Sequence, residues 1–318
     1  MKNFLLLSIL LGASVALSPV SAANFLVDDD GDDAGTPGTL RHAIAQANGN
    51  AEEDTITIDP SLFFIALVDD GPLFISSTDK ITIDASGVTN GVAISGFDGN
   101  GLGFPSRVIE VNAGASLELV GVEISDGKAA DGDDGVDGAV PTNGGDGGNG
   151  GGIFNEGTLV LRDCKIVFNE AGDGGDAGNK TNTGAGSAGL AGNGGQGGGT
   201  WEGDNGGGGI GFGGRGVTNA NSIVCLNQAG TDPNIEIGFL FDGNNLVGVN
   251  PDLDVLTDLG GAAEVLPPNL SSPAIDGGGA LANQLSVDQR GFPRPSGGAP
   301  DIGSLEVGLQ PDAKIGTK

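Results

Sequence analysis

The chain repeats itself at an offset of 42 residues, and this repetition constrains the fold more than any other feature of the sequence. The matched positions are apolar in both copies: Leu117 with Leu159, Leu119 with Leu161, Val122 with Cys164, and Ile124 with Ile166. A fainter third copy places Val224-Cys225-Leu226-Asn227 on Ile166-Val167-Phe168-Asn169. Equivalent positions that keep their size and polarity are typical of a solenoid, in which each coil stacks on the one before.

Short bursts of alternating apolar residues predict that the coils are built from strands. The bursts lie at residues 56–58, 73–75, 81–83, 92–94, 108–111 and 117–119, and Gly, Asn, Asp or Ser follow most of them. Residues 127–151 supply about half of the offset, which leaves about twenty residues for one coil. We therefore expect an all-β fold, a right-handed parallel β-helix whose coils stack about 4.8 Å apart.

The composition excludes several other classes of protein. Glycine supplies 63 of the 318 residues, which argues against a mostly helical fold because each Gly in a helix interior costs about 1 kcal/mol. A strict Gly-X-Y period is absent from the sequence, which excludes collagen. The net charge is −29, and since nucleic acid and anionic lipid are bound mainly by Lys and Arg, we expect neither as a partner.

Residues 1–23 have the pattern of a secretory signal peptide. Lys2 precedes an apolar run from Phe4 to Leu11, and Val20-Ser21-Ala22-Ala23 offers small residues for cleavage. A retained membrane anchor is the alternative, and no later segment is apolar for long enough to cross a bilayer. We expect a single β-helix domain over 24–306, followed by a tail over 307–318.

The two ends of the solenoid need covers, because an unpaired strand edge invites aggregation. Residues 36–49 are predicted to form a capping helix, with Thr36 or Thr39 as N-cap. Its apolar face would carry Leu40, Ala43, Ile44 and Ala47. Residues 245–306 are expected to form a C-terminal coil and cap.

Two glycine-rich insertions, 127–151 and 172–209, are expected to project from one corner of the solenoid. Between Gly127 and Gly216, 34 of the 90 residues are Gly. Long loops on a repeat scaffold are usually either functional or mobile. Alternatively, the glycine-rich segments pack against one another as thin polyproline-like layers.

The repeat also bears on the two cysteines, Cys164 and Cys225. Aligning Asn169 with Asn227 places Cys164 on Ser222 and Cys225 on Val167, so the two thiols belong to opposite faces of the strand. A disulfide is therefore disfavoured, and both residues are interpreted as small core or surface fillers.

Several stretches resemble bacterial exported proteins. Residues 39–44 followed by 54–59 resemble the CSLREA-type N-terminal segment, with Gly38 in place of its Cys and His42 in place of its Glu. Residues 150–155 and 157–161 are similar to the repeats of polymorphic outer-membrane proteins, and 272–277, 288–294 and 301–306 to the choice-of-anchor Q region. The resemblance implies a pectin-lyase-like right-handed β-helix at the bacterial surface, and it brings no catalytic assignment.

Two acidic runs are candidate calcium sites, because Ca²⁺ prefers several oxygen ligands on flexible loops. The candidate ligands are all aspartates: Asp28, Asp30, Asp32, Asp131, Asp133, Asp134 and Asp137. The EF-hand pattern fails, since no Gly stands at the required place and no Glu closes the loop. The alternative is a solvated acidic surface that keeps the chain soluble.

A carbohydrate-active enzyme is the main rival function, because polysaccharide lyases and hydrolases share this fold. A lyase needs cations beside the substrate carboxylate, and the arginines are scattered along the sequence rather than repeated on one face. A hydrolase needs two opposed carboxylates, for example Asp163 with a neighbour, but acidic residues are too common for such a pair to be informative. His42 is interpreted as a surface residue of the cap.

Two further residue types bear on ligand binding and on the C-terminal segment. Trp201 stands among glycines, where an exposed indole could stack on a sugar; the alternative is that it covers apolar residues of the solenoid. Arg290 and Arg294 lie among Asp276, Asp288, Asp301 and Glu306, and they are expected to clip the C-terminal segment onto the last coil.

Together these features predict a non-enzymatic protein that is secreted or held at the cell surface. Its role would be structural, adhesive or glycan-binding, with extracellular polysaccharide or cell-envelope components as partners. No cofactor other than calcium is indicated.

Overall fold

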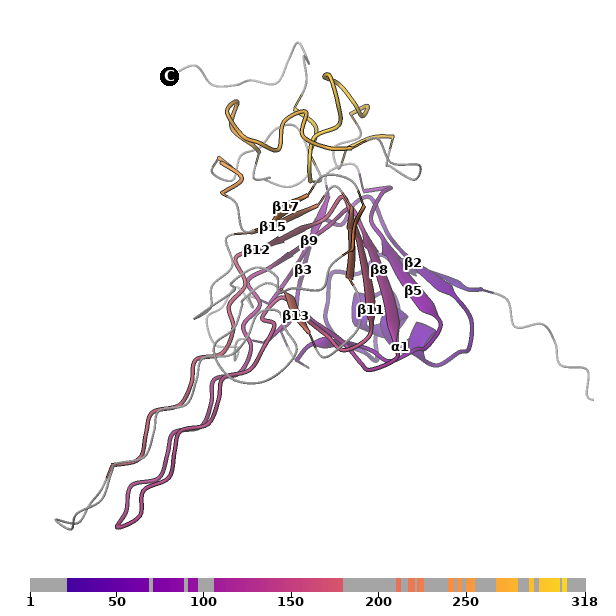
Figure 1. The fold of residues 1–318 in the computed structure, drawn as a ribbon. Helices are drawn as coiled ribbons and strands as arrows, with labels where there is room; N and C mark the ends of the chain where they lie inside the picture. Colours follow the sequence, from indigo (N-terminus) through magenta and orange to yellow (C-terminus); the bar gives the residue numbers. More distant parts are fainter. Residues whose placement is uncertain are drawn as a thin grey trace, which may run out of the picture.

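The computed structural model describes residues 22–68, 71–88, 91–96, 106–179, 210–212, 217–220, 222–225, 240–242, 245–247, 250–254, 267–279, 286–288, 292–303 and 305–307. These residues are mostly strands in parallel sheets, with one helix among them (Figure 1). The predicted all-β class is therefore confirmed. No described helix is long and apolar enough to cross a membrane.

Among the described residues, three sheets make up the body. Sheet A contains, in spatial order, β1 (Asn24–Val27), β2 (Asp54–Ile58), β5 (Lys80–Asp84), β8 (Ser116–Val120), β11 (Thr158–Arg162), β14 (Val217–Ala220) and β16 (Leu240–Asp242). Sheet B contains β3 (Phe64–Ala66), β6 (Val92–Ser95), β9 (Val122–Ser125), β12 (Lys165–Val167), β15 (Ile223–Cys225) and β17 (Leu246–Val247). Sheet C contains β4 (Leu73–Ile75), β7 (Ile109–Val111), β10 (Ile153–Asn155) and β13 (Ile210–Phe212).

From β2 to β15 the chain visits sheets A, B and C in turn, and each strand pairs in parallel with the strand of the preceding round. Leu117 lies between Ile81 and Leu159 in sheet A, and Ile124 lies between Ile94 and Ile166 in sheet B. The predicted 42-residue registration is therefore confirmed for these positions. The third copy is confirmed as well, because Ile166 pairs with Val224.

The core is a stack of aliphatic side chains between the three sheets. Its members include Ile81, Leu117 and Leu159, each 0% exposed. Burial of one such side chain stabilises the fold by about 1.5–3 kcal/mol. Small and medium aliphatic groups suffice because each one is covered by its equivalent in the next round.

The helix α1 (Leu40–Asn48) covers the end at which β1, β3 and β4 are the edge strands. Thr39 is its N-cap, and the hydroxyl of Thr39 accepts a hydrogen bond of 3.1 Å from the amide of His42. Leu40, Ala43, Ile44 and Ala47 are buried in the core, as the predicted apolar face requires. The helix begins at Leu40, four residues later than the segment predicted for the cap.

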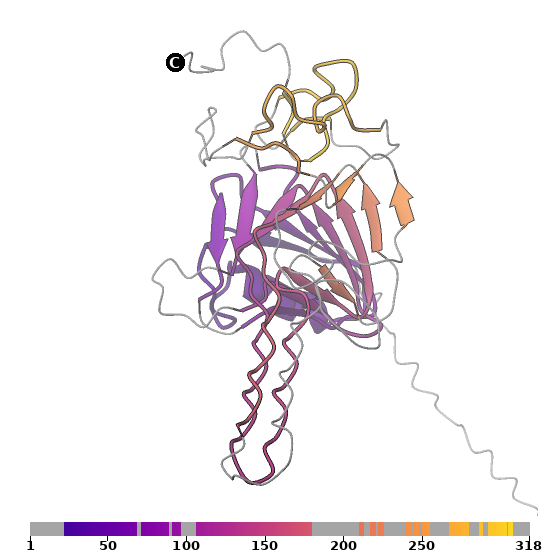
Figure 2. The same cartoon turned by 60° about the vertical axis from the view of Figure 1, so that its left-hand side comes forward.

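The C-terminal segment, defined as the described residues between 250 and 307, lies over the outer side of sheet B (Figures 1 and 2). A second apolar cluster joins the two parts. It contains Val167 and Leu246 from β12 and β17, and Ala274, Ile302 and Leu253 from the C-terminal segment. Ile166 and Val247 belong to the inner core, so their neighbours Val167 and Leu246 face outward.

Cys164 is a free cysteine with no exposed surface. Its amide donates a 3.2 Å hydrogen bond to the hydroxyl of Ser222, the residue that the sequence alignment placed opposite. Burial raises the pKa of the Cys164 thiol to about 12, which makes it a poor nucleophile. The interpretation of Cys164 as a core filler agrees with this environment.

Candidate functional site: the glycine-rich finger

A long narrow finger projects from the body, away from the C-terminal segment (Figures 1 and 2). It consists of residues 127–151, which leave the body after β9 and return at β10, and of residues 170–179, which leave after β12. The chain runs out over 127–138, back over 142–151 and out again over 170–179. Residues 180–209 of the second predicted insertion, Trp201 included, lie outside the described residues.

The three segments of the finger are joined by hydrogen bonds between their backbones. The first donates to the third, from Gly132, Gly135 and Gly138 to the carbonyls of Asp173, Asp176 and Asn179 (2.7, 2.7 and 3.0 Å). The second donates to the first, from Gly145 and Gly148 to Asp133 and Ala130 (both 2.7 Å). The third donates to the second, from Gly172, Gly175 and Gly178 to Gly148, Gly145 and Thr142 (2.9, 2.8 and 3.1 Å).

Successive donors stand three residues apart, which is the period of a polyproline II helix. Of the two interpretations of the glycine-rich segments, packing as thin polyproline-like layers is the one that describes residues 127–151 and 170–179. Each segment donates to one neighbour and accepts from the other, so the finger is a closed hydrogen-bonded bundle.

Several positions inside this bundle require glycine, because there is no space for the Cβ of any other residue. A Cβ on Gly172 would overlap the carbonyl oxygen of Ala130, and one on Gly175 would overlap that of Asp133. By contrast, a Cβ on Gly138 would meet its nearest neighbour at 3.7 Å, an ordinary contact. The finger therefore holds together by backbone contact, without an apolar core.

Aspartates along one edge of the finger bind backbone amides of the neighbouring segment. The carboxylates of Asp131, Asp134 and Asp137 accept hydrogen bonds from the amides of Asp173, Asp176 and Asn179 (2.8, 2.8 and 2.5 Å). The bond from Asp173, assisted by the nearby ammonium of Lys128, lowers the pKa of Asp131. Lys128 lies at the base of the finger, 3.2 Å from Glu170 and 3.4 Å from Asp131.

The seven aspartates predicted to bind calcium do not converge on one point. Asp131, Asp134 and Asp137 each bind a different amide, and the backbone carbonyl of Asp133 is an acceptor within the bundle. In the part of the chain that the structure describes, no three His, Cys, Asp or Glu side chains form a group that could hold a metal ion. The calcium prediction thus has no coordinating group among these residues.

In the other predicted calcium run, Asp32 has a structural role. Its carboxylate lies 2.8 Å from Nη2 of Arg41 and accepts a 2.9 Å hydrogen bond from the amide of Val68. Arg41 also donates to the carbonyls of Gly71 and Pro72. His42, predicted to be a surface residue of the cap, has Nδ1 2.8 Å from the carbonyl of Ala34.

A row of charged side chains that was not predicted from the sequence lies on the outer face of sheet A. Glu118 of β8 lies 2.9 Å from Lys80 of β5 and 2.7 Å from Arg162 of β11. The three residues come from adjacent strands, and Glu118 is only 4% exposed. The repeat contained the signal, because it fixes the register of these strands. Both oxygens of Glu118 are thus engaged by cations.

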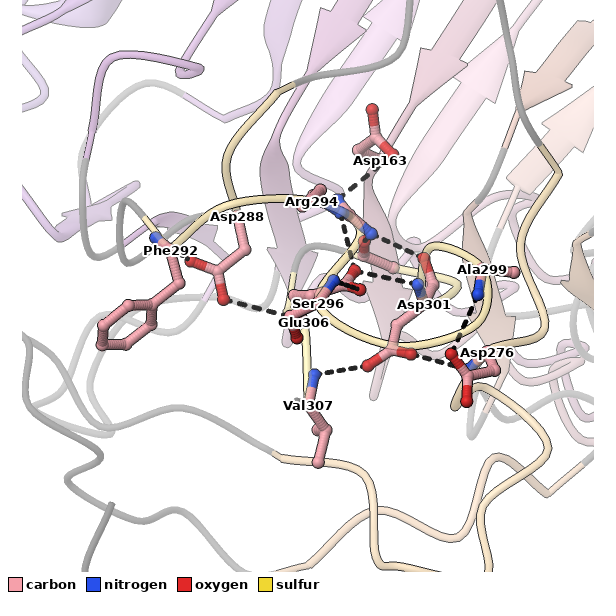
Figure 3. Close-up of polar contacts among 11 residues, drawn as sticks. Asp163, Asp276, Asp288, Phe292, Arg294, Ser296, Ala299, Asp301, Glu306 and Val307 are labelled. Atoms are coloured by element: carbon pink, nitrogen blue, oxygen red, sulfur yellow. Dashed lines mark hydrogen bonds and ion pairs between the residues drawn. The ribbon is translucent and has the colours of Figure 1, made fainter. Parts of the chain in front are cut away.

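Arg294 fastens the C-terminal segment to the body as predicted, but to the turn between β11 and β12 rather than to the last coil (Figure 3). Its guanidinium lies 3.3 Å from Asp163, at the turn between β11 and β12, and 3.1 Å from Glu306. It also donates to the carbonyls of Asp301 and Gly303 (2.5 and 2.8 Å). Arg290 lies outside the described residues.

Comparisons of the chain with protein-family models, with curated proteins and with solved structures found no match.

Proposed function

We propose that the body is a right-handed parallel β-helix of the pectin-lyase-like kind, in a protein related to bacterial exported β-helix proteins. The ordered visits to sheets A, B and C and the like-on-like registration of Leu117 with Leu159 support this proposal. The quoted motifs of the CSLREA-type and choice-of-anchor Q segments support it independently, as does the signal-peptide pattern of residues 1–23.

We further propose that the protein is a non-catalytic, exported surface protein whose body is a scaffold and whose finger makes the external contacts. The observation that carries this proposal is the closed hydrogen-bonded bundle of the finger. Its backbone bonds give the glycine-rich segments a defined shape, and the finger projects away from the body (Figure 2). The tip carries exposed apolar side chains: Val136 is 69% and Val140 is 87% exposed. Extracellular polysaccharide or cell-envelope material is the proposed partner.

A binding experiment with matched glycine variants tests this function. The protein lacking residues 1–23 is passed over an immobilised panel of bacterial envelope preparations and extracellular polysaccharides. Gly175→Ala, which inserts a methyl group where no space exists, should weaken retention at least tenfold, whereas Gly138→Ala should bind like the parent. Failure of the parent to bind any member of the panel, or equal binding by both variants, would refute the proposal.

A carbohydrate-active enzyme is the second candidate, and the row formed by Lys80, Glu118 and Arg162 favours it. Charged residues stacked on adjacent strands of one sheet are the arrangement expected of a substrate-binding face. The full engagement of Glu118 argues against its acting as an acid or base in this state. Incubation with the same polysaccharides, followed by assay for new reducing ends and unsaturated sugars, decides between the two. Products formed by the parent and lost in Glu118→Gln would establish catalysis.

A further inference from the structure

The C-terminal segment is fastened to the body through a buried cluster that is rich in carboxyl groups (Figure 3). Its ionisable members are Arg294, Asp163, Asp288, Asp301 and Glu306. Each of the four acidic residues is at most 2% exposed. Burial of several carboxylates around one guanidinium is costly, because charges are poorly solvated in a protein interior.

The carboxyl groups of the cluster differ in their hydrogen-bond and ion-pair partners. The ion pairs of Arg294 go to Asp163 and Glu306, and Glu306 also accepts bonds from the amides of Ser296 and Asp301 (both 2.9 Å). Asp288 accepts from the amides of Phe292 and Glu306 (both 3.0 Å). Both bonds to Asp301 come from amides, those of Asp276 (2.6 Å) and Val307.

Asp301 is the most deeply buried of the four acidic residues, with 0% of its surface exposed. Burial and, secondarily, the charge of Glu306 raise the pKa of Asp301 to about 6, despite its amide donors and Arg294. Asp276, whose amide donates to Asp301, has an exposed side chain, and Lys165 of β12 lies 3.5 Å from Glu123. Asp301 consequently changes charge between mildly acidic and neutral conditions.

We propose that this cluster is a pH-sensitive latch, which holds the C-terminal segment on the outer side of sheet B in mildly acidic medium and loosens as the medium becomes neutral. A carboxyl group whose pKa is higher when folded stabilises the folded state fully below its unfolded pKa, near 3.8, and loses that contribution as the pH rises through about 6. The C-terminal segment is thus held most tightly below about pH 4, and the contribution of Asp301 is lost once the pH exceeds about 6.

Opening of the latch would uncover the apolar contacts between the segment and the body. Val167 and Leu246 on the body and Ala274 and Ile302 on the segment form these contacts. The inference is independent of the proposed finger function, since no residue of the finger belongs to the cluster.

Hydrogen exchange of the full chain, read by mass spectrometry at pH 4, 5, 6 and 7 and corrected for intrinsic rates, tests the proposal. Protection of peptides within 292–307 should fall by up to about tenfold for each pH unit between about pH 4 and 6, which is the limit for one proton, and should level off above pH 6. Protection of β8, in the core of the body, should stay constant. A flat profile for 292–307, or one that rises with pH, would overturn the latch.

Two variants assign the effect to its residue. Asp301→Asn removes the titrating group and one amide contact, so protection of 292–307 should be lower than in the parent at pH 5 but independent of pH. Asp254→Asn, the same change at an exposed residue of the C-terminal segment, should keep the pH profile of the parent. If Asp301→Asn retains the parental profile, the assignment is wrong.

A second measurement covers the case in which Asp301→Asn does not fold. Carbon-13 NMR titration of the Asp301 carboxyl in the parent should give a midpoint near 6. A midpoint near the ordinary value of about 4 would overturn the proposal.

Discussion

The body and the finger solve the same problem, the folding of a repetitive chain, in opposite ways. In the body, every round places aliphatic side chains on those of the previous round, as Leu117 and Leu159 do, and their burial stabilises the stack. In the finger, every third residue has no side chain, so that backbones approach closely enough to bond directly. One chain can therefore be ordered in two ways, by the packing of buried side chains or by direct hydrogen bonding between closely approaching backbones.

Truncation of a core residue should give the largest effect and should act on the body alone. Leu117→Ala removes buried methyl groups from the middle of sheet A, and we expect a loss of about 2–5 kcal/mol in the free energy of unfolding. Chemical denaturation followed by circular dichroism measures this loss. Leu26→Ala, at a side chain that is 53% exposed, is the matched control and should cost far less. Equal losses in both variants would contradict the aliphatic stack as the source of stability.

Addition of one methyl group should act on the finger alone. Gly144→Ala places a Cβ against the carbonyl of Gly175, and we expect local destabilisation of about 1–3 kcal/mol because neither backbone can yield without breaking the bundle. Hydrogen exchange should speed up in 129–148 and 170–179, while the melting temperature of the body changes little. If the whole protein lost stability together, the two regions would be one cooperative unit rather than two.

Loss of an edge carboxylate should have the smallest effect. Asp134→Ala removes the acceptor of the Asp176 amide, and we expect a local cost of at most about 1 kcal/mol because the bond is exposed to water. Exchange of the Asp176 amide is the measurement, and Asp133→Ala, which changes a side chain while its backbone carbonyl remains the acceptor, is the control. A loss as large as that in Gly144→Ala would mean that side chains, and not backbone contacts, hold the finger.

The same contrast explains what could be predicted from the sequence. Apolar periodicity gave the register of Leu117 with Leu159, the capping helix at Leu40–Asn48 and the pairing of Ile166 with Val224, because side-chain burial leaves a pattern in the residue types. The clip at Arg294 was also predicted. Its partner Asp163, 131 positions away, could not be chosen among so many acidic residues, because only the fold brings the two together.

The pairing of segments within the finger is also visible in the sequence as a repeat, although the high glycine content makes that repeat hard to recognise. Asp131 and Asp134 stand 42 positions before Asp173 and Asp176, the same offset as in the body, and these pairs are bonded in the structure. The sequence could not show which carbonyl each glycine amide would bind, because glycine carries no side chain to indicate direction. Three of the aspartates predicted to bind calcium, Asp131, Asp134 and Asp137, each accept a hydrogen bond from an amide of the neighbouring segment.

The closed hydrogen-bonded bundle of the finger also limits how its length can change during evolution. A triplet inserted in one segment would shift its donors past the carbonyls of one neighbour and its carbonyls past the donors of the other, so growth or shortening requires the same triplet change in all three segments at once. The length of the finger can therefore change only in steps of about 9 Å, because three residues of a polyproline II helix span about that distance.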